Sequence, residues 1–353
     1  PVPRSRGDGV MRAAVYERYG APEVVRIQER GEPGLGTGEV LVRVAATVVG
    51  ASESAARSGR PWFARLYFGL RKPRFPVLGT DFAGTVERVG EGVTRFAPGD
   101  LVFGSAGTGF GAHAELVTVS EGHVLAHVPH GLEASEAVAT IDGFLTALPF
   151  LRDVARVQAG QTVLVNGASG TVGTAAVQLA KHLGATVVGV CSAGHAPLVA
   201  SLGADRVIDY ASEDFAATRG AYDVIFDAVG TRTFGQCRAA LTEHGIYLAT
   251  IPTAAILLQT PLTRLFGRGR RAAIAFTGLR PEEDKAGELP LLVGLLESGA
   301  MVPVIDRVVT FADIVEAHRR VDGGHKAGSV VVALAPALPP TEAPALRPTE
   351  AAS

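Results

Sequence analysis

Residues Thr162–Gly173 read TVLVNGASGTVG and carry most of the fold information in this chain. Thr162–Asn166 is a short apolar run typical of a buried strand, and the glycines that follow lead into an apolar helix. Gly167 allows a tight turn, Gly170 allows close approach of a pyrophosphate, and Gly173 allows close helix–strand packing. The stretch therefore predicts a dinucleotide phosphate-binding loop at a helix N-terminus. The alternative is a glycine-rich turn of an α/β domain without a ligand.

The surrounding sequence alternates between strand and helix patterns. Together they predict a doubly wound parallel α/β sheet. The expected strands are Thr162–Asn166, Thr186–Cys191, Arg206–Ile208, Asp223–Asp227 and Gly245–Thr250, and the expected helices are Glu133–Leu151, Thr171–Leu183, Pro197–Leu202 and Phe234–Leu241.

Both ends of the chain predict a second, strand-rich domain. Val40–Val44 and Ala83–Val89 alternate like half-buried strands. After the expected parallel sheet, helix and strand patterns mix again. This predicts that the chain re-enters the first domain, which is therefore discontinuous. The expected late helices are Glu288–Ser298 and Ala312–Val321, and the late strands are Val304–Val309 and Ser329–Leu334. We predict a disordered leader over 1–10, a catalytic domain over 11–130 and 279–335, a cofactor domain over 131–278, and a disordered tail over 336–353.

Composition excludes several classes of protein. The chain has 353 residues and a formal net charge of -2, so it lacks the basic surface of a general nucleic-acid binder. Cys191 and Cys237 are its only cysteines, too few for a disulfide framework or a four-cysteine zinc site, and they favour a cytoplasmic location. The uncharged windows Gln161–Ala180 and Gly245–Thr263 are interrupted by glycine or proline, so no membrane span is predicted.

The end of the second expected strand indicates the nucleotide. NAD-binding folds usually carry an acid there, which binds the ribose 2′-hydroxyl. Val190–His195 contains no carboxylate that would repel a 2′-phosphate, while Ser192 can donate a hydrogen bond and His195 can add charge. NADPH is the predicted cofactor. The alternative is that both residues are ordinary loop residues.

Three segments resemble one family. Val163–Tyr210, Pro76–Gly104 (PVLGTDFAGTVERVGEGVTRFAPGDLVFG) and Gly111–Leu116 (GAHAEL) resemble the medium-chain dehydrogenase/reductase superfamily. Within it, the chain is similar to the zinc-free, zeta-crystallin-like branch of quinone oxidoreductases and enoyl reductases. The resemblance implies a Rossmann cofactor domain plus a discontinuous GroES-like catalytic domain, and it implies a homodimer.

The metal ligands of the zinc-dependent relatives are missing. Gly50-Ala51-Ser52 and Gly79-Thr80-Asp81 stand where a cysteine and a Gly-His-Glu block would ligate zinc. The best remaining candidate is the set His123, His127 and His130. Its neighbours favour a strand, which would separate the first two histidines by about 13 Å. No metal is predicted.

The resemblance implies hydride transfer from NADPH to a small apolar carbonyl, quinone or enoyl substrate. Hydrogen-bond donors or solvent must then stabilise the charge on the substrate oxygen. The cofactor contacts that it implies, together with those predicted above, are Thr146, Gly167, Ser169, Gly170, Thr171, Val172, Gly173, Ser192, His195, Tyr210, Val229, Gly230, Ala249, Thr250 and Ile251.

The chain also departs from these relatives. Gly50–Glu53 and Ala55 replace polar residues that relatives often carry near the hydride site, and Ala196-Pro197 stands where a lysine commonly follows. The closing Gly-Lys has become Gly328-Ser329.

Arg60–Lys72 joins the only tryptophan to other aromatic and basic residues. It is either a lid or wall over an apolar substrate or an amphipathic surface helix. Tyr67 and Arg57 are the candidates for substrate contact or proton donation. Asp81, Asp142 and His113 are expected to be structural.

Three functions fit these patterns. The first is an NADPH-dependent reductase. The second is an NADPH-binding sensor or partner protein with residual activity, suggested by the lost polar residues. The third is a dehydratase or cyclase on the same fold. Turnover that consumes NADPH separates the first from the others.

Overall fold

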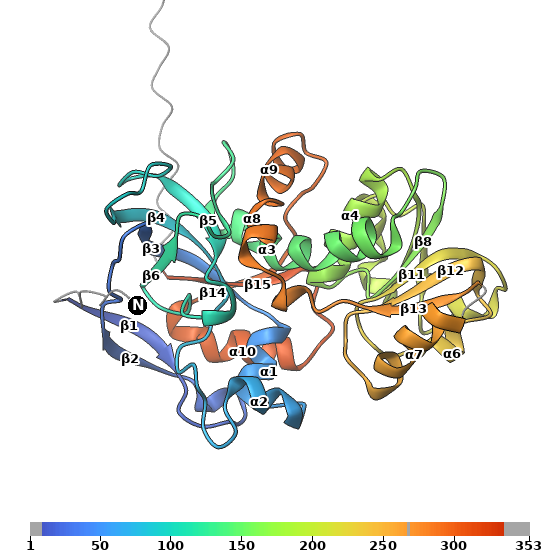
Figure 1. Cartoon of the computed structure of the whole chain (residues 1–353), viewed down its shortest axis with the longest axis horizontal. Coiled ribbons are helices and arrows are strands. Elements are labelled where there is room, and N and C mark those ends of the chain that lie inside the picture. Colours follow the sequence, from blue (N-terminus) through green and yellow to red (C-terminus); the bar gives the residue numbers. More distant parts are fainter. Residues whose placement is uncertain (1–8, 267–268, 335–353) are drawn as a thin grey trace, which may run out of the picture.

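The computed structural model describes residues 9–266 and 269–334, which form two lobes with one long helix between them (Figure 1). The predicted tail, 336–353, and residues 1–8 of the predicted leader lie outside the described residues. Val10 is not part of a disordered leader, because it begins strand β1 and pairs with Gly31.

The parallel-sheet lobe contains a six-stranded sheet in the order β10-β9-β8-β11-β12-β13, with every neighbouring pair parallel. Helices flank the sheet, so its central strands are buried and almost wholly apolar. Its strands are β8 Thr162–Asn166, β9 Thr186–Cys191, β10 Arg206–Asp209, β11 Tyr222–Asp227, β12 Leu241–Ala249 and β13 Arg271–Ile274. Its helices are α4 Thr171–His182, α5 Ala196–Ser201, α6 Phe234–Cys237 and α7 Ala254–Phe266.

One predicted element of this lobe is wrong in part. The helix expected over Phe234–Leu241 is the single turn α6, and β12 begins four residues earlier than the expected Gly245. Leu241 is fully buried and pairs with Tyr222 of β11. Sheet pairing and burial therefore override the helical pattern at this position.

The mixed-sheet lobe contains a seven-stranded sheet in the order β14-β15-β3-β4-β5-β7, with β6 also pairing with β3. β15, from the end of the chain, runs antiparallel to β3, so the strand-rich domain is discontinuous as predicted. The strands are β1 Val10–Val15 and β2 Arg26–Gly31, which pair with each other, then β3 Glu39–Val49, β4 Asp81–Val89, β5 Leu101–Ser105, β6 Leu116–Ser120, β7 Leu125–His127, β14 Ile305–Thr310 and β15 Ser329–Ala333. The other helices are α1 Ala51–Ser58, α2 Arg65–Phe68, α8 Glu282–Ala286, α9 Leu289–Glu297 and α10 Ile314–Asp322.

Helix α3, Ala134–Leu148, lies between the lobes and continues as a π-helical turn, Pro149–Ala155 (Figure 1). A Cβ placed on Gly143 would lie 2.6 Å from the carbonyl oxygen of Thr171, so α3 crosses α4 at backbone distance. One hydrophobic cluster includes α3 and strands of both sheets. By length and composition, Ala134–Ala155 could cross a bilayer, but 67% of its most apolar window is buried, as in a core helix of a soluble protein.

Candidate active site

The glycine loop joins β8 to α4, and two of its glycines have the predicted structural roles. Gly167 has φ 81°, which favours glycine, and it turns the chain directly after β8. A Cβ on Gly173 would lie 2.0 Å from the carbonyl oxygen of Gly167, so any side chain there would separate the helix from the loop. A Cβ placed on Gly170 would lie 3.6 Å from the carbonyl oxygen of Gly167, which is an ordinary contact, so this position is not crowded. The first amides of α4, with Ser169, Thr171 and Val172 around them, can bind phosphate oxygens.

The segment 326–328, directly before β15, holds this loop in place. The Gly328 N–H donates to Ser169 O at 2.7 Å, and Thr171 Oγ1 donates to Gly328 O at 2.9 Å. Lys326 Nζ donates to Gly328 O at 2.6 Å and contacts Thr171 Oγ1 at 2.5 Å. Burial lowers the pKa of Lys326 to about 8. A lysine two residues before Gly328 thus brings an ammonium group to the loop, although the family's closing Gly-Lys is absent.

Asp227 organises the neighbouring strand ends, a role that the sequence reasoning missed. Its Oδ1 accepts hydrogen bonds from Asn166 Nδ2 at 2.9 Å and from the N–H groups of Val229 and Gly230 at 3.1 and 2.9 Å. The Tyr247 hydroxyl donates to its Oδ2 at 2.6 Å. The available signal was an acid directly after the apolar run of β11, where only an internally bonded carboxylate can be buried.

The other predicted cofactor residues lie at the same carboxyl edge of the parallel sheet. Ser192 follows β9, with its Oγ 3.4 Å from His195 Nδ1, and Tyr210 follows β10 and donates its N–H to Cys191 O. Ala249 ends β12, Ile251 lies two residues further on, and between them Thr250 donates its N–H to Asp227 O at 3.2 Å. Such an edge is where ligands bind in open α/β sheets.

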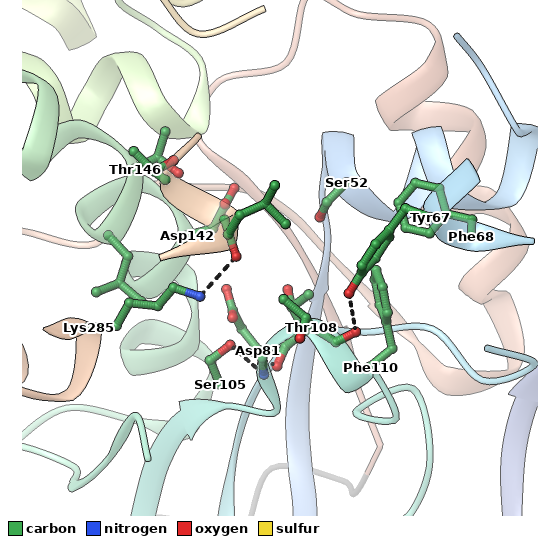
Figure 2. A pocket seen from close by; sticks show the side chains of 16 residues that line it. Ser52, Tyr67, Phe68, Asp81, Ser105, Thr108, Phe110, Asp142, Thr146 and Lys285 are labelled. Carbon is green, nitrogen blue, oxygen red and sulfur yellow. Dashed lines mark hydrogen bonds between the residues drawn. The ribbon is translucent and has the colours of Figure 1, made fainter. Parts of the chain in front are cut away.

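A cavity of about 240 Å³ lies beside α3, between α2, β4, β5 and α8 (Figure 2). Thr146 lines it, together with aromatic, aliphatic and polar side chains. The lining residues are Ser52, Tyr67, Phe68, Thr80, Asp81, Ser105, Gly107, Thr108, Phe110, Asp142, Leu145, Thr146, Thr277, Gly278, Leu279 and Lys285. Asp142, Thr146 and Lys285 lie on one side, and Tyr67 and Phe68 form an aromatic wall on the other (Figure 2). Thr146 and the wall thus face one shared space.

The segment Arg60–Lys72 forms a 3-10 turn, Trp62–Ala64, and the one-turn helix α2, so it is not the amphipathic helix considered above. Tyr67 and Phe68 face the cavity and support the interpretation as a wall. The Tyr67 hydroxyl donates to Thr108 O at 3.0 Å. Trp62, with 76% of its surface exposed, lies outside the residues that line the cavity.

The interpretation of Arg57 as a substrate contact does not fit its position. Arg57 is 1% exposed and does not line the cavity. One guanidinium nitrogen donates to Gly20 O at 2.5 Å, and the other forms an ion pair with Asp322 at 2.5 Å. This side chain therefore joins α1 to α10 and is structural.

Asp81 and Asp142 were expected to be structural, but both line the cavity. Glu53, on the first turn of α1, lies next to them and was not singled out from the sequence. His113 does fit the structural expectation, since it is 1% exposed and its Nε2 lies 2.8 Å from Val48 O. Sequence reasoning missed the group because its acids lie far apart along the chain.

The histidine set does not form a metal site. His127 ends β7 in extended conformation, as expected, and its Nε2 lies 3.1 Å from Asp100 Oδ2 at the surface. Over residues 9–266 and 269–334, no three His, Cys, Asp or Glu side chains are grouped so as to hold a metal ion.

Comparisons with known proteins agree with this architecture. Residues 36–130 match the alcohol dehydrogenase GroES-like domain family, and residues 202–332 match the family described as zinc-binding dehydrogenase. The chain is 30% identical to the chloroplastic quinone-oxidoreductase QR1 of Triphysaria versicolor over 92% of this chain and 98% of that protein.

Solved structures give the same result. The quinone oxidoreductase of Coxiella burnetii superposes with a TM-score of 0.81 at 27% identity, over 93% of this chain and all of that one. A mycobacterial protein in complex with NADPH superposes with a TM-score of 0.77 at 29% identity, over 92% of this chain and all of that one. This chain therefore belongs to the medium-chain dehydrogenase/reductase superfamily of oxidoreductases.

Proposed function

We propose that this protein is an NADPH-dependent reductase that transfers hydride, without a catalytic metal, to a small apolar enone, enoyl or quinone substrate. The observation that carries the proposal is the position of the cavity. It opens beside Thr146 on α3, the helix that crosses the glycine-loop helix α4 at backbone distance. A nicotinamide ring that reaches from the loop to Thr146 would meet a substrate held against Tyr67 and Phe68.

The choice of NADPH is supported by the end of β9. Ser192 and His195 stand there instead of an acid. The carboxylate of Asp209, at the end of the neighbouring strand β10, is already engaged, because it accepts the N–H of Ala211 at 3.1 Å. A relative in the same family has been solved with NADPH. The proposed substrate class is supported by the aromatic wall and by the names of the quinone oxidoreductase relatives.

We also propose a cytoplasmic homodimer. β13 forms an edge of the parallel sheet, and the neighbouring helix α7 exposes a row of leucines, Leu257, Leu258, Leu262 and Leu265. An unpaired edge beside an apolar helix face is a surface that a second copy can cover. Both cysteines are free and buried, which suits a reducing compartment.

The test is a spectrophotometric screen of the purified full chain, run both without and with EDTA. We expect saturable NADPH oxidation with at least one quinone, enone or enoyl thioester, and much slower oxidation of NADH. Measured NADPH binding without turnover across the panel would instead favour a sensor or binding protein. Product formation without NADPH consumption would favour a dehydratase or cyclase. Activity that is lost with EDTA and restored by zinc would overturn the metal-free part of the proposal.

A further inference from the structure

Three acids from three different elements meet beside the cavity. Glu53 comes from α1, Asp81 from β4 and Asp142 from α3. A Cβ placed on Gly50 would lie 3.1 Å from Glu53 Oε2 and 3.6 Å from Asp142 Oδ2, so these two carboxyl groups approach the same point. Repulsion between the acids raises the pKa of Asp81 and of Asp142 in addition to the effect of burial.

Glu53 is surrounded by hydrogen-bond donors. Its Oε2 accepts from the Gly50 N–H and from Ser52 Oγ, both at 2.9 Å. Its Oε1 accepts from the Thr80 N–H and from Thr80 Oγ1, both at 3.1 Å. Glu53 is 1% exposed, so solvent screens the charge of its carboxylate only weakly. Its charge therefore acts on the two aspartates.

Asp81 and Asp142 are arranged differently. Asp81 is 3% exposed and lines the cavity, and its Oδ2 has no hydrogen-bond partner within the described part of the chain. Burial, followed by repulsion from Asp142 and Glu53, raises its pKa well above the ordinary value. Burial, followed by repulsion from Glu53, raises the pKa of Asp142 to about 6. Both groups thus hold a proton more readily than an exposed aspartate does.

The cationic and neutral groups around Asp142 offset only part of the rise in its pKa. Lys326 and the hydrogen bond with Thr146 lower the pKa of Asp142. Lys285 also lines the cavity, but its Nζ donates to Gly278 O at 3.0 Å and to Glu282 Oε1 at 2.9 Å. Burial lowers the pKa of His113, so this neighbour adds no positive charge near neutral pH.

We propose that Asp142 is the proton donor of the reduction and that Glu53 is the positioning residue that favours its acid form. This inference rests on the proposed reductase function. In reduction of an enone, hydride from C4 of the dihydronicotinamide forms the new C–H bond at Cβ, and the π electrons move onto the carbonyl oxygen. The Asp142 O–H bond then breaks, and its proton bonds to Cα as the carbonyl re-forms. The O–H electron pair stays on the carboxylate, which takes up a proton from solvent to restore the acid.

The first test compares wild-type protein with Asp142→Asn on an enone substrate identified in the screen. The amide keeps the size and polarity of the side chain but carries no transferable proton. We expect kcat to fall by about 100-fold or more, within the usual contribution of general acid catalysis, and the NADPH Kd to stay within about threefold. Glu297→Gln, an exposed acid-to-amide change on α9, is the matched control and should leave kcat unchanged.

The second test is the pH profile of kcat between pH 5 and 8. The acid form of Asp142 is the active one, so wild-type kcat should fall as pH rises through about 6, and Asp142→Asn should show no such fall. Glu53→Gln removes the repelling charge, so it should move the wild-type inflection to lower pH by about one unit without abolishing turnover. A purely structural role of Glu53 would lower activity equally at every pH.

The outcomes separate the two proposals. Unchanged kcat and an unchanged inflection in Asp142→Asn would overturn this inference while leaving the reductase function intact. An inflection that does not move in Glu53→Gln would overturn the role of Glu53. Wild-type protein that binds NADPH but reduces no acceptor would overturn both.

Discussion

The glycine loop and the cavity lined by Asp81 and Asp142 are neighbours, but they are formed by different parts of the chain in different ways. The loop is one stretch of twelve residues, and its chemistry lies in backbone amides and in the absence of side chains at Gly167 and Gly173. The cavity collects side chains from Ser52 to Lys285, and its chemistry lies in two lining acids, Asp81 and Asp142, which folding brings close to Glu53. A backbone site leaves a continuous pattern in the sequence, whereas a side-chain site assembled from distant elements does not.

Gly173→Val should cause the largest loss, in NADPH affinity, and it tests whether the backbone of the glycine loop binds the phosphates. The new Cβ would lie 2.0 Å from Gly167 O and 2.8 Å from Ala168 Cα, and both are backbone atoms that cannot rotate away. We expect NADPH affinity to fall by about 1000-fold or more, together with a lower melting temperature, because the loop and helix must separate. Fluorescence titration and thermal unfolding measure both.

Gly294→Ala is the control for that change, since the space around an added Cβ is empty there. It should leave NADPH affinity unaltered, and the melting temperature should stay the same or rise slightly because alanine favours a helix over glycine. If Gly173→Val bound NADPH normally, the loop would not be the phosphate site.

Ser192→Asp should have an intermediate effect and tests whether a side chain at the rim of the backbone site selects the nucleotide. A carboxylate beside a 2′-phosphate is repelled, whereas a ribose 2′-hydroxyl can donate to it. We expect the NADPH Kd to rise by about 100-fold and the NADH Kd to change by less than about threefold. Ser201→Asp, on the exposed face of α5, controls for added charge. Equal changes for both nucleotides would show that Ser192 lies away from the 2′ position.

Tyr67→Ala should have the smallest effect, a rise in KM, and it tests whether the aromatic wall of the cavity contacts the substrate. Loss of the aromatic wall should raise KM by about tenfold with little change in kcat, because the ring contributes apolar contact. Tyr67→Phe keeps the ring and loses only the hydrogen bond to Thr108 O, so it should behave almost as wild type. A large fall in kcat for Tyr67→Phe would make the hydroxyl a proton donor and would contradict the role proposed for Asp142.

Sequence patterns predicted the parallel sheet well because its strands are buried on both faces and appear as continuous apolar runs. β8 and β9 have the predicted bounds, and β11 begins one residue earlier than expected. Prediction failed where tertiary contacts outweigh local preference. Leu241 belongs to β12 because it pairs with Tyr222 of β11. Arg57 is structural because it forms an ion pair with Asp322 of α10.

The amino-acid order alone was sufficient for the glycine loop, the alternation that produces the parallel sheet, and the family resemblance. These features are local, since turn geometry, burial pattern and helix N-terminus all lie within a few neighbouring residues. The placement of Lys326 at the loop, of Asp227 among the strand ends and of Glu53 beside Asp81 and Asp142 followed only from the folded chain. Their significance depends on distance, burial and mutual charge, and none of these is encoded at any single position in the sequence.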